Sequence, residues 1–285
     1  LIANRGEIAV RINRACQELG ISTVAIHSEA DADSMHVRIA DESVCIGPNP
    51  VNKSYLNAHA IISACEITGA QAIHPGYGFL SENASFAKML DDHKLTFIGP
   101  KHKHISMMGD KIEAKKIMQE YGVPTVPGSK GAVADLKDAL KTSKDIGFPV
   151  LLKASAGGGG RGMKVVNDEK ELTDALPIIK QEAVSFFGND SIYIEKFIDS
   201  PRHIEIQVIC DSHNNFLHLH ERDCSIQRRN QKVIEEALAP EIDQAKKEKL
   251  FKICIDAMAK MGYLGLGTLE FLFAENEFYF MEMNT

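Results

Sequence analysis

One stretch limits the folds open to this chain more than any other: the glycine run Gly157–Gly160, which lies between Lys153 and Arg161. Short apolar runs flank it at residues 148–152 and 163–166. Two apolar strands joined by glycines form a hairpin whose tip has few side chains. Backbone N–H groups of such a tip approach a polyanion closely, and the two flanking cations add positive charge. A flexible linker is the alternative, but the apolar strands on both sides favour a triphosphate-binding loop.

Strands and helices alternate along the first hundred residues. The pattern predicts strands at 1–3, 22–26, 70–73 and 96–98, with helices at about 8–19, 57–68 and 83–90. Such alternation is typical of a parallel sheet with helices on both faces. Sites in these sheets lie beyond the C-terminal strand ends, where Arg5, Glu7 and the turn at 74–79 fall. The full Gly-x-Gly-x-x-Gly fingerprint is absent after the first strand, which disfavours dinucleotide binding.

The middle of the chain has the pattern of a small α+β lid that carries the glycine hairpin. A helix is expected from Asp110, as its cap, to about Tyr121. The Gly- and Pro-rich residues 122–128 then mark a hinge or a domain boundary. Further helices are expected at 134–146 and 169–187, and Pro177 predicts that the second of these consists of two pieces.

Two polar stretches follow the lid. His203, Glu205 and Gln207 alternate with apolar residues and therefore share one strand face; a solvated face and the wall of a wet cleft both remain open. Residues 222–232 are rich in Arg, Lys and amides. They form either a surface loop or a pocket wall for anions, because Arg and Lys hydrogen-bond phosphate and bicarbonate well.

The last element reads as a β-hairpin that turns around residues 275–277. With a three-residue loop, Glu270 lies opposite Glu282, and Asn284 falls on the same face. Two carboxylates and an amide suit Mg²⁺ or Mn²⁺, and burying the carboxylates unpaired would be costly. A two-residue loop would separate the two glutamates onto opposite faces.

Composition excludes several classes of function. The formal charge of −7 leaves no basic surplus for nucleic acid, and no apolar run approaches the roughly 20 residues that span a bilayer. Six scattered cysteines without a Cys-x-x-Cys pair indicate reduced thiols in a cytoplasmic protein. We therefore expect neither a nucleic-acid nor a membrane partner. The chain starts inside an apolar strand and stops directly after another, so we expect a C-terminally truncated fragment.

Taken together, these blocks resemble the ATP-grasp enzymes, and within them the biotin carboxylases, most of all the biotin carboxylase subunit of bacterial acetyl-CoA carboxylase. The resemblance covers essentially the whole chain and is strongest at residues 2–8, 74–83, 108–111, 153–163, 201–207, 221–229 and 280–285. It implies a mixed α/β and α+β fold. An N-terminal Rossmann-like (pre-ATP-grasp) domain at 1–98 and a linker helix at 99–124 precede an ATP-grasp domain, of which 125–197 are the lid and 198–285 the start of the C-terminal subdomain.

The resemblance also implies an activity. Bicarbonate attacks the γ-phosphate of ATP to give carboxyphosphate, whose CO₂ passes to N1′ of biotin on a biotin carboxyl carrier protein. A carboxyltransferase partner and a homodimer are implied as well, within the first half-reaction of acetyl-CoA carboxylase and fatty acid synthesis. The alternatives are the corresponding part of a propionyl-CoA, methylcrotonyl-CoA or pyruvate carboxylase, another ATP-grasp ligase, and a nucleotide-binding module without turnover.

Residue roles are carried over from the resemblance by position. The phosphate contacts are Lys111, Lys153, Gly157, Gly158, Gly159 and Gly160. The adenine contacts are Glu195, Lys196, Phe197 and Ile198, through the Glu195 carbonyl and the Ile198 amide. The residues along the ribose and phosphates are His203, Gln227 and Asn230. The ligands of Mg²⁺ or Mn²⁺ are Glu270, Glu282 and Asn284, and the bicarbonate contact is Lys232.

The chain departs from the family pattern in two places. Asn230 stands where many members carry His; Asn still forms hydrogen bonds but cannot be cationic. The family's general base Glu and its bicarbonate-binding Arg belong to a segment beyond Thr285. We therefore expect this chain to bind ATP but to lack a complete carboxylation site, and to be inactive alone.

Overall fold

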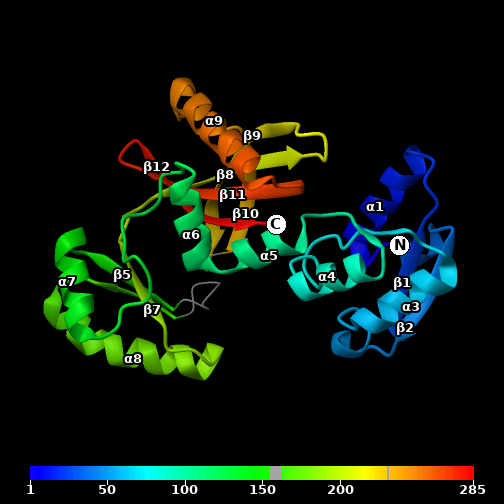
Figure 1. The fold of residues 1–285 in the computed structure, drawn as a ribbon, viewed down its shortest axis with the longest axis horizontal. Coiled ribbons are helices and arrows are strands. Elements are labelled where there is room, and N and C mark those ends of the chain that lie inside the picture. Colours follow the sequence, from blue (N-terminus) through cyan, green and yellow to red (C-terminus); the bar gives the residue numbers. More distant parts are fainter. Residues whose placement is uncertain (155–161, 230) are drawn as a thin grey trace. The chain divides into compact units, whose positions relative to one another are not determined.

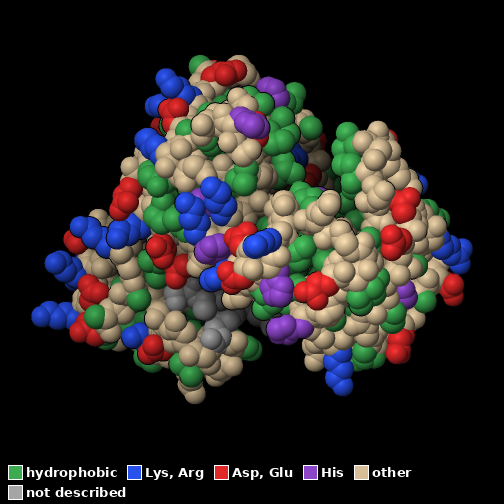
Figure 2. All heavy atoms as spheres, turned by 45° about the vertical axis from the view of Figure 1, so that its right-hand side comes forward, with side chains coloured by type: hydrophobic (Ala, Val, Ile, Leu, Met, Phe, Trp, Pro, Cys, Tyr) green, Lys and Arg blue, Asp and Glu red, His purple; other side chains and the backbone are tan. Residues whose placement is uncertain are grey.

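The computed structural model describes residues 1–154, 162–229 and 231–285; Figure 1 shows the fold. The chain divides into two compact units. One comprises Leu1–Ser106, Tyr263–Leu266 and Thr285, and the other Met107–Gly262 and Gly267–Asn284. Acidic and basic side chains are interspersed over the surface visible in Figure 2. Within the described ranges, no helix has both the length and the apolar character needed to cross a membrane.

Parallel strands form the centre of the first unit, as predicted. Strand β1 (Val24–Ser28) pairs with β2 (Glu42–Gly47), and β3 (Ala72–Ile73) pairs with β4 (Thr96–Phe97), both in parallel. Ile2 forms parallel bridges to Ala25 and to His74 and so connects the two pairs. Strand β2 was not predicted from the sequence.

Helices cover both faces of this parallel array. They are α1 (Gly6–Glu18), α2 (Met35–Arg38), α3 (Ala58–Thr68) and α4 (Ala84–Asp92), with short 3₁₀ turns η1 (Glu29–Asp31) and η2 (Val51–Lys53). Helix α5 (His102–Gly109) contains the point at which the first unit ends and the second begins. Neighbouring residues of an extended segment point to opposite faces. Ile2 packs with Ile12 of α1, whereas Ala3 belongs to a separate cluster with Ile61 of α3 and Phe86 of α4.

A buried carboxylate network stabilises the strand ends of this unit. Asp31 accepts hydrogen bonds from the Tyr55 hydroxyl at 2.7 Å and from the Arg5 guanidinium at 2.6 and 2.7 Å. The Ser28 hydroxyl lies 3.3 Å away. The Arg5 contact is the main reason that the pKa of Asp31 lies well below its ordinary value of 3.8.

We expect Asp31→Asn to lower the free energy of unfolding by about 2 kcal/mol, because hydrogen bonds to a charged group are lost while Arg5 stays partly hydrated. The folded-state pKa is depressed, so this stabilisation is present above about pH 4 and is lost as the pH falls below it. Urea unfolding between pH 3 and pH 7 measures both effects. Asp33→Asn, at an exposed position, is the matched control, and equal stability of the two variants at pH 7 would contradict the prediction.

The second unit contains the segment that was predicted to form a lid, and we keep that name for it. Strands β5 (Val150–Ala154), β6 (Met163–Val166) and β7 (Ile192–Lys196) form an antiparallel sheet in the order β6-β5-β7. Helices α7 (Leu136–Ile146) and α8 (Glu169–Phe187) pack with it around a common core. The strands predicted on both sides of the glycine run are thus confirmed as an antiparallel pair. The tip itself, Gly157–Gly160, lies outside the described residues.

The prediction that Pro177 divides the next helix is wrong. Helix α8 is continuous from Glu169 to Phe187, with Pro177 inside it. Its buried apolar residues lie on both sides of the proline, with Leu172 before it and Ile179 and Ala183 after it. This continuous contact with the lid core outweighs the one backbone hydrogen bond that proline removes.

A larger sheet completes the second unit. Its strands are β8 (Arg202–Cys210), β9 (Phe216–Arg228), β10 (Gln231–Ala237), β11 (Gly265–Ala274) and β12 (Glu277–Asn284), in the order β10-β9-β8-β11-β12. Helix α9 (Gln244–Met261), which was not predicted from the sequence, packs on β8 and β9, and α6 (Lys111–Glu120) packs on β12. The predicted cap of α6 is confirmed, since Asp110 accepts from the N–H groups of Ile112 and Glu113.

Most of the stretch 222–232 lies in strands within the described residues. Strand β9 continues to Arg228, and β10 begins at Gln231. The charged side chains suit a strand here because they have partners across it: Arg222 lies opposite Glu205 of β8 and forms an ion pair with it. Cross-strand pairing of opposite charges favours extended structure.

Candidate active site

The turn of the last hairpin is shorter than the loop on which the glutamate register was predicted. Ala274 pairs with Glu277, so the turn contains only Glu275 and Asn276. Both have positive φ, 50° and 68°, as a type I′ hairpin turn requires. With regular pairing, a turn of this length would separate the two glutamates.

A β-bulge nevertheless brings the two glutamates together. The register shifts by one residue between Glu270 and Phe271, which leaves Met281 as the extra residue on β12. Glu270 therefore lies directly opposite Glu282. Asn284 is two residues further along the same strand face, and its amide donates to Glu270 at 2.6 Å. The predicted grouping of Glu270, Glu282 and Asn284 is thus present, although by a different route.

Glu270 and Glu282 line a cavity of about 650 Å³ between the lid sheet and the larger sheet, whereas Asn284 is not among its lining residues. Its polar lining is Lys111, Lys153, Tyr193, His203, Ser225, Gln227, Gln231, Lys232, Glu270 and Glu282. Its apolar lining is Leu151, Ala154, Met163, Pro201, Leu272 and Met281. Seven predicted site residues, from distant parts of the chain, therefore line one cavity.

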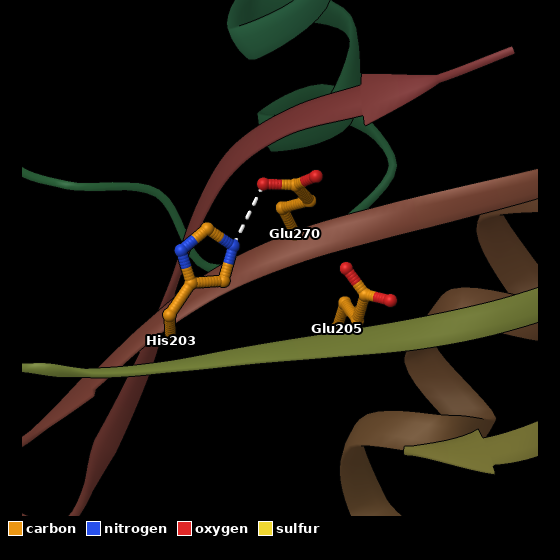
Figure 3. Close-up of side chains that lie close together, drawn as sticks. All are labelled: His203, Glu205 and Glu270. Carbon is orange, nitrogen blue, oxygen red and sulfur yellow. Dashed lines mark hydrogen bonds and ion pairs between the residues drawn. The ribbon is translucent and has the colours of Figure 1, made fainter. Parts of the chain in front are cut away.

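Glu270 is the central acceptor of this cavity. Figure 3 shows His203 and Glu205, both on β8, beside Glu270 on the neighbouring strand β11. His203 Nε2 lies 2.7 Å from one oxygen of Glu270, and Lys232 Nζ donates to the other oxygen at 2.7 Å. Burial favours the protonated acid, but the His203 and Lys232 contacts outweigh it and lower the pKa of Glu270 to about 2. Glu270 is therefore an anion throughout the physiological pH range.

Lys232 joins two buried carboxylates. Its ammonium donates to Glu205 at 2.5 Å and to Glu270 at 2.7 Å. Burial lowers the pKa of Lys232, but these two contacts outweigh it and raise the pKa above its ordinary value. Arg222 neutralises Glu205 from the other side and donates to Gln207 at 3.1 Å. Lys232 is thus held as a cation at the wall of the cavity.

The chemistry of these donors fits a divalent cation. Glu270 and Glu282 are opposed carboxylates, and Asn284 adds an amide oxygen, which together are the oxygen ligands that Mg²⁺ and Mn²⁺ prefer. Both carboxylates carry a compensating ammonium, since Lys111 lies 2.8 Å from Glu282 and Lys232 lies 2.7 Å from Glu270. If a metal ion and a polyphosphate bind together, these two ion pairs would be replaced: the carboxylates would bind the metal and the lysines would bind the phosphates.

The lid side of the cavity holds a second charged cluster. Glu195 of β7 has a side chain only 3% exposed and forms ion pairs with Lys153 of β5, at 2.5 Å, and with Lys115 of α6. Both ammonium groups lie over the ring of Tyr193, at 5.9 and 5.4 Å from its centroid. Burial and the nearby Lys111 lower the pKa of Lys153 to about 8.

The remaining predicted residues lie elsewhere or outside the description. Among the described residues, Glu195, Lys196, Phe197 and Ile198 do not line the cavity, and the ammonium of Lys196 donates to the carbonyls of Gly147 and Phe148. Their adenine contacts therefore stay predictions. Asn230 and the tip Gly157–Gly160 lie outside the described residues.

Sequence reasoning gave no role to Lys115 and Tyr193, and placed Glu205 and Arg222 only within a possible cleft or pocket wall. Glu205 was placed on the same face as His203, but its pairing with Lys232 depends on how β8, β9 and β10 align. Lys115 follows Lys111 by one helical turn and so shares its face of α6. The four-residue spacing from Lys111 was the sequence signal that could have identified Lys115.

Two sequence families match the chain. "Biotin carboxylase, N-terminal domain" matches residues 1–105, and "Carbamoyl-phosphate synthase L chain, ATP binding domain" matches residues 110–285. The biotin carboxylase of Pseudomonas aeruginosa is 56% identical over the whole chain. The mitochondrial propionyl-CoA carboxylase alpha chain of mouse is 53% identical, also over the whole chain.

Solved structures agree with these matches. A biotin carboxylase from Campylobacter jejuni, described as a complex with β,γ-ATP, superposes with a TM-score of 0.93 at 51% identity. The biotin carboxylase domain dimer of Hydrogenobacter thermophilus 2-oxoglutarate carboxylase, described with MgADP, ADP and bicarbonate, gives 0.91 at 49% identity. All of this chain is covered in both cases. The chain spans 64% of the length of the Pseudomonas relative and 40% of that of the mouse protein, and 64% and 63% of the two structures.

Proposed function

Because the chain belongs to the biotin carboxylase family of ATP-grasp enzymes, we propose that it binds ATP for the carboxylation of biotin by bicarbonate. In the proposed reaction, a bicarbonate oxygen attacks the γ-phosphorus and the bond to the β,γ-bridging oxygen breaks. ADP leaves, and the product is carboxyphosphate. Its CO₂ is then transferred to N1′ of biotin, and inorganic phosphate is released.

One observation carries this proposal: cations and carboxylates from four separate segments line a single cavity between the lid and the larger sheet. Lys111 and Lys153 supply positive charge, and Glu270 and Glu282 supply opposed carboxylates. Phosphoryl transfer depends mainly on positioning and on neutralising charge, and this lining provides the side chains for both.

The roles proposed for the cavity residues follow from their chemistry. Lys111 and Lys153 hold the phosphates, together with the glycine tip. Lys232 contacts bicarbonate, since it is kept cationic by Glu205 and Glu270. His203, Gln227 and Asn230 lie along the ribose and phosphates, and the segment Glu195–Ile198 holds the adenine. Gln227 also donates to the Cys224 carbonyl at 2.9 Å and lies 2.9 Å from His203 Nδ1, which orients both side chains.

Glu270, Glu282 and Asn284 are the proposed ligands of Mg²⁺ or Mn²⁺. When bound, the ion would neutralise phosphate charge during transfer. The protein's own contribution is to keep Glu270 ionised, through His203 and Lys232, and to hold the two carboxylates opposite each other, through the bulge at Met281.

Two measurements test this function. Nucleotide binding is measured on the present chain by calorimetry with MgATP, where tight binding is expected. Turnover is measured on the whole natural protein as ATP hydrolysis that requires bicarbonate and is stimulated by free biotin. Hydrolysis that is independent of bicarbonate and biotin would contradict the proposal, and formation of carbamoyl phosphate from ammonia would instead indicate another ATP-grasp ligase.

The proposed partners are a biotin carboxyl carrier protein and a carboxyltransferase, with the protein itself acting as a homodimer. The Hydrogenobacter structure is described as a dimer. The proposed compartment is the cytoplasm, in line with six free cysteines.

Acetyl-CoA is the proposed final acceptor, on the resemblance to the biotin carboxylase subunit of acetyl-CoA carboxylase; the relatives at 54–56% identity are named biotin carboxylase, without an acyl-CoA. Propionyl-CoA is the competing acceptor, supported by the alpha chains at 51–53% identity. The acyl-CoA that the partner carboxyltransferase carboxylates in the reconstituted system decides between them.

A further inference from the structure

Lys115 is the least exposed of the three lysines that gather at the lid side of the cavity. Its side chain is 15% exposed, against 18% for Lys153 and 32% for Lys111. Within the described part of the chain, Lys111 and Lys153 line the cavity and Lys115 does not. Lys115 therefore lies outside the lining of the cavity as the described residues define it.

Glu195 is the group through which Lys115 is connected to the cavity. Its carboxylate is 3% exposed and is shared between Lys115 and Lys153. A buried carboxylate is costly without a counter-ion. If Lys153 leaves Glu195 for a phosphate, the carboxylate needs another cation, and Lys115 is already in contact with it.

We propose that Lys115 is a positioning residue for ATP: it takes over as the counter-ion of Glu195 when Lys153 moves to the nucleotide phosphates. This inference rests on the proposed ATP-binding function and extends it to a residue outside the cavity. Without Lys115, the carboxylate of Glu195 has Lys153 as its only described cation and holds it back from the phosphates.

The charges around Glu195 favour this movement of Lys153 from the carboxylate to a phosphate. Burial, together with repulsion from Lys153 and Lys111, lowers the pKa of Lys115 to about 6. While Lys153 stays beside Glu195, its repulsion therefore disfavours the charged form of Lys115. Movement of Lys153 toward a phosphate removes its repulsion, so the ion pair between Lys115 and Glu195 strengthens as the nucleotide binds.

Calorimetry with MgATP on the present chain tests the proposal. Lys115→Met is expected to weaken ATP binding about tenfold or more, which corresponds to about 1.4 kcal/mol. Lys116→Met, at the next and exposed position of α6, is expected to bind as the wild type does. Adding Glu195→Gln to Lys115→Met is expected to restore affinity, because the neutral amide no longer retains Lys153. A purely structural role for Lys115 would not give this rescue.

The ATP affinity of the Lys115 and Lys153 double variant, compared with that of the single variants, gives a second readout. Lys115→Met is expected to have no further effect in a chain that already carries Lys153→Met, because Lys115 acts through that side chain. Wild-type affinity of Lys115→Met, or failure of Glu195→Gln to rescue it, would overturn the proposal. If Lys115→Met does not fold, the double variant is compared with Glu195→Gln alone; equal affinity supports the proposal and a loss overturns it. A wild-type chain that does not bind ATP would instead refute the proposed function.

Discussion

Glu270→Gln is expected to reduce bicarbonate-dependent ATP hydrolysis by the whole natural protein by about a hundredfold or more, the scale seen when a preorganised charge is removed from an active site. Glu270 accepts from Lys232 and Asn284 on one oxygen and lies against His203 on the other. A glutamine side chain has the same size but offers only one acceptor oxygen. In either orientation of the glutamine amide, its NH₂ group would face a hydrogen-bond donor in place of an acceptor oxygen.

The same substitution should also raise the concentration of Mg²⁺ needed for half-maximal activity, because one of two opposed carboxylates becomes neutral. Hydrolysis rates measured across a Mg²⁺ titration at saturating ATP report both effects. Glu277→Gln is the control on the same hairpin, since its side chain is exposed. Wild-type turnover with an unchanged Mg²⁺ requirement in Glu270→Gln would remove Glu270 from the proposed metal site.

Local sequence patterns were sufficient to predict those elements of the fold that neighbouring residues determine. The alternation in residues 1–98 predicted a parallel array, and the apolar runs around the glycines predicted paired strands. Both are present. The capping role of Asp110 was equally readable, because a cap is satisfied within its own first turn.

Predictions failed where a distant contact outweighs a local preference. Pro177 weakens a helix locally, yet α8 continues through it because its apolar face packs on the lid core. For residues 222–232 the sequence left a surface loop and a pocket wall open. Residues 222–228 and 231–232 lie in strands, where Glu205 of β8 pairs with Arg222 and Lys232, and four of them line the cavity.

The candidate site shows the same contrast between features that neighbouring residues determine and features that distant contacts determine. The pairing of Glu270 with Glu282 was predicted from a three-residue loop, whereas the structure has a two-residue turn and a bulge at Met281. A bulge has no reliable sequence signal, because it depends on how the flanking side chains pack. Lys115 was not predicted because its role arises only when α6, β5 and β7 come together around Glu195.

Lys153→Met is expected to weaken ATP binding by about ten- to a hundredfold, because a charge-assisted hydrogen bond to a phosphate contributes roughly 1.5–3 kcal/mol. Methionine keeps the unbranched length of the side chain and its packing over Tyr193. Burial lowers the pKa of the Lys153 ammonium to about 8 in the free protein. The phosphates bind the protonated form, so the affinity of the wild type should fall as the pH rises above 8, whereas that of Lys153→Met should not.

Calorimetry with MgATP at pH 7, 8 and 9 measures the loss and its pH dependence together on the present chain. Lys164→Met on β6 is the matched control, since this lysine is exposed on the strand that pairs with β5. It should bind ATP as the wild type does and show the same decline above pH 8. Unchanged affinity in Lys153→Met would mean that the phosphates do not bind between the lid and the two glutamates, because Lys153 is the cation that the lid sheet contributes to the cavity lining within the described residues.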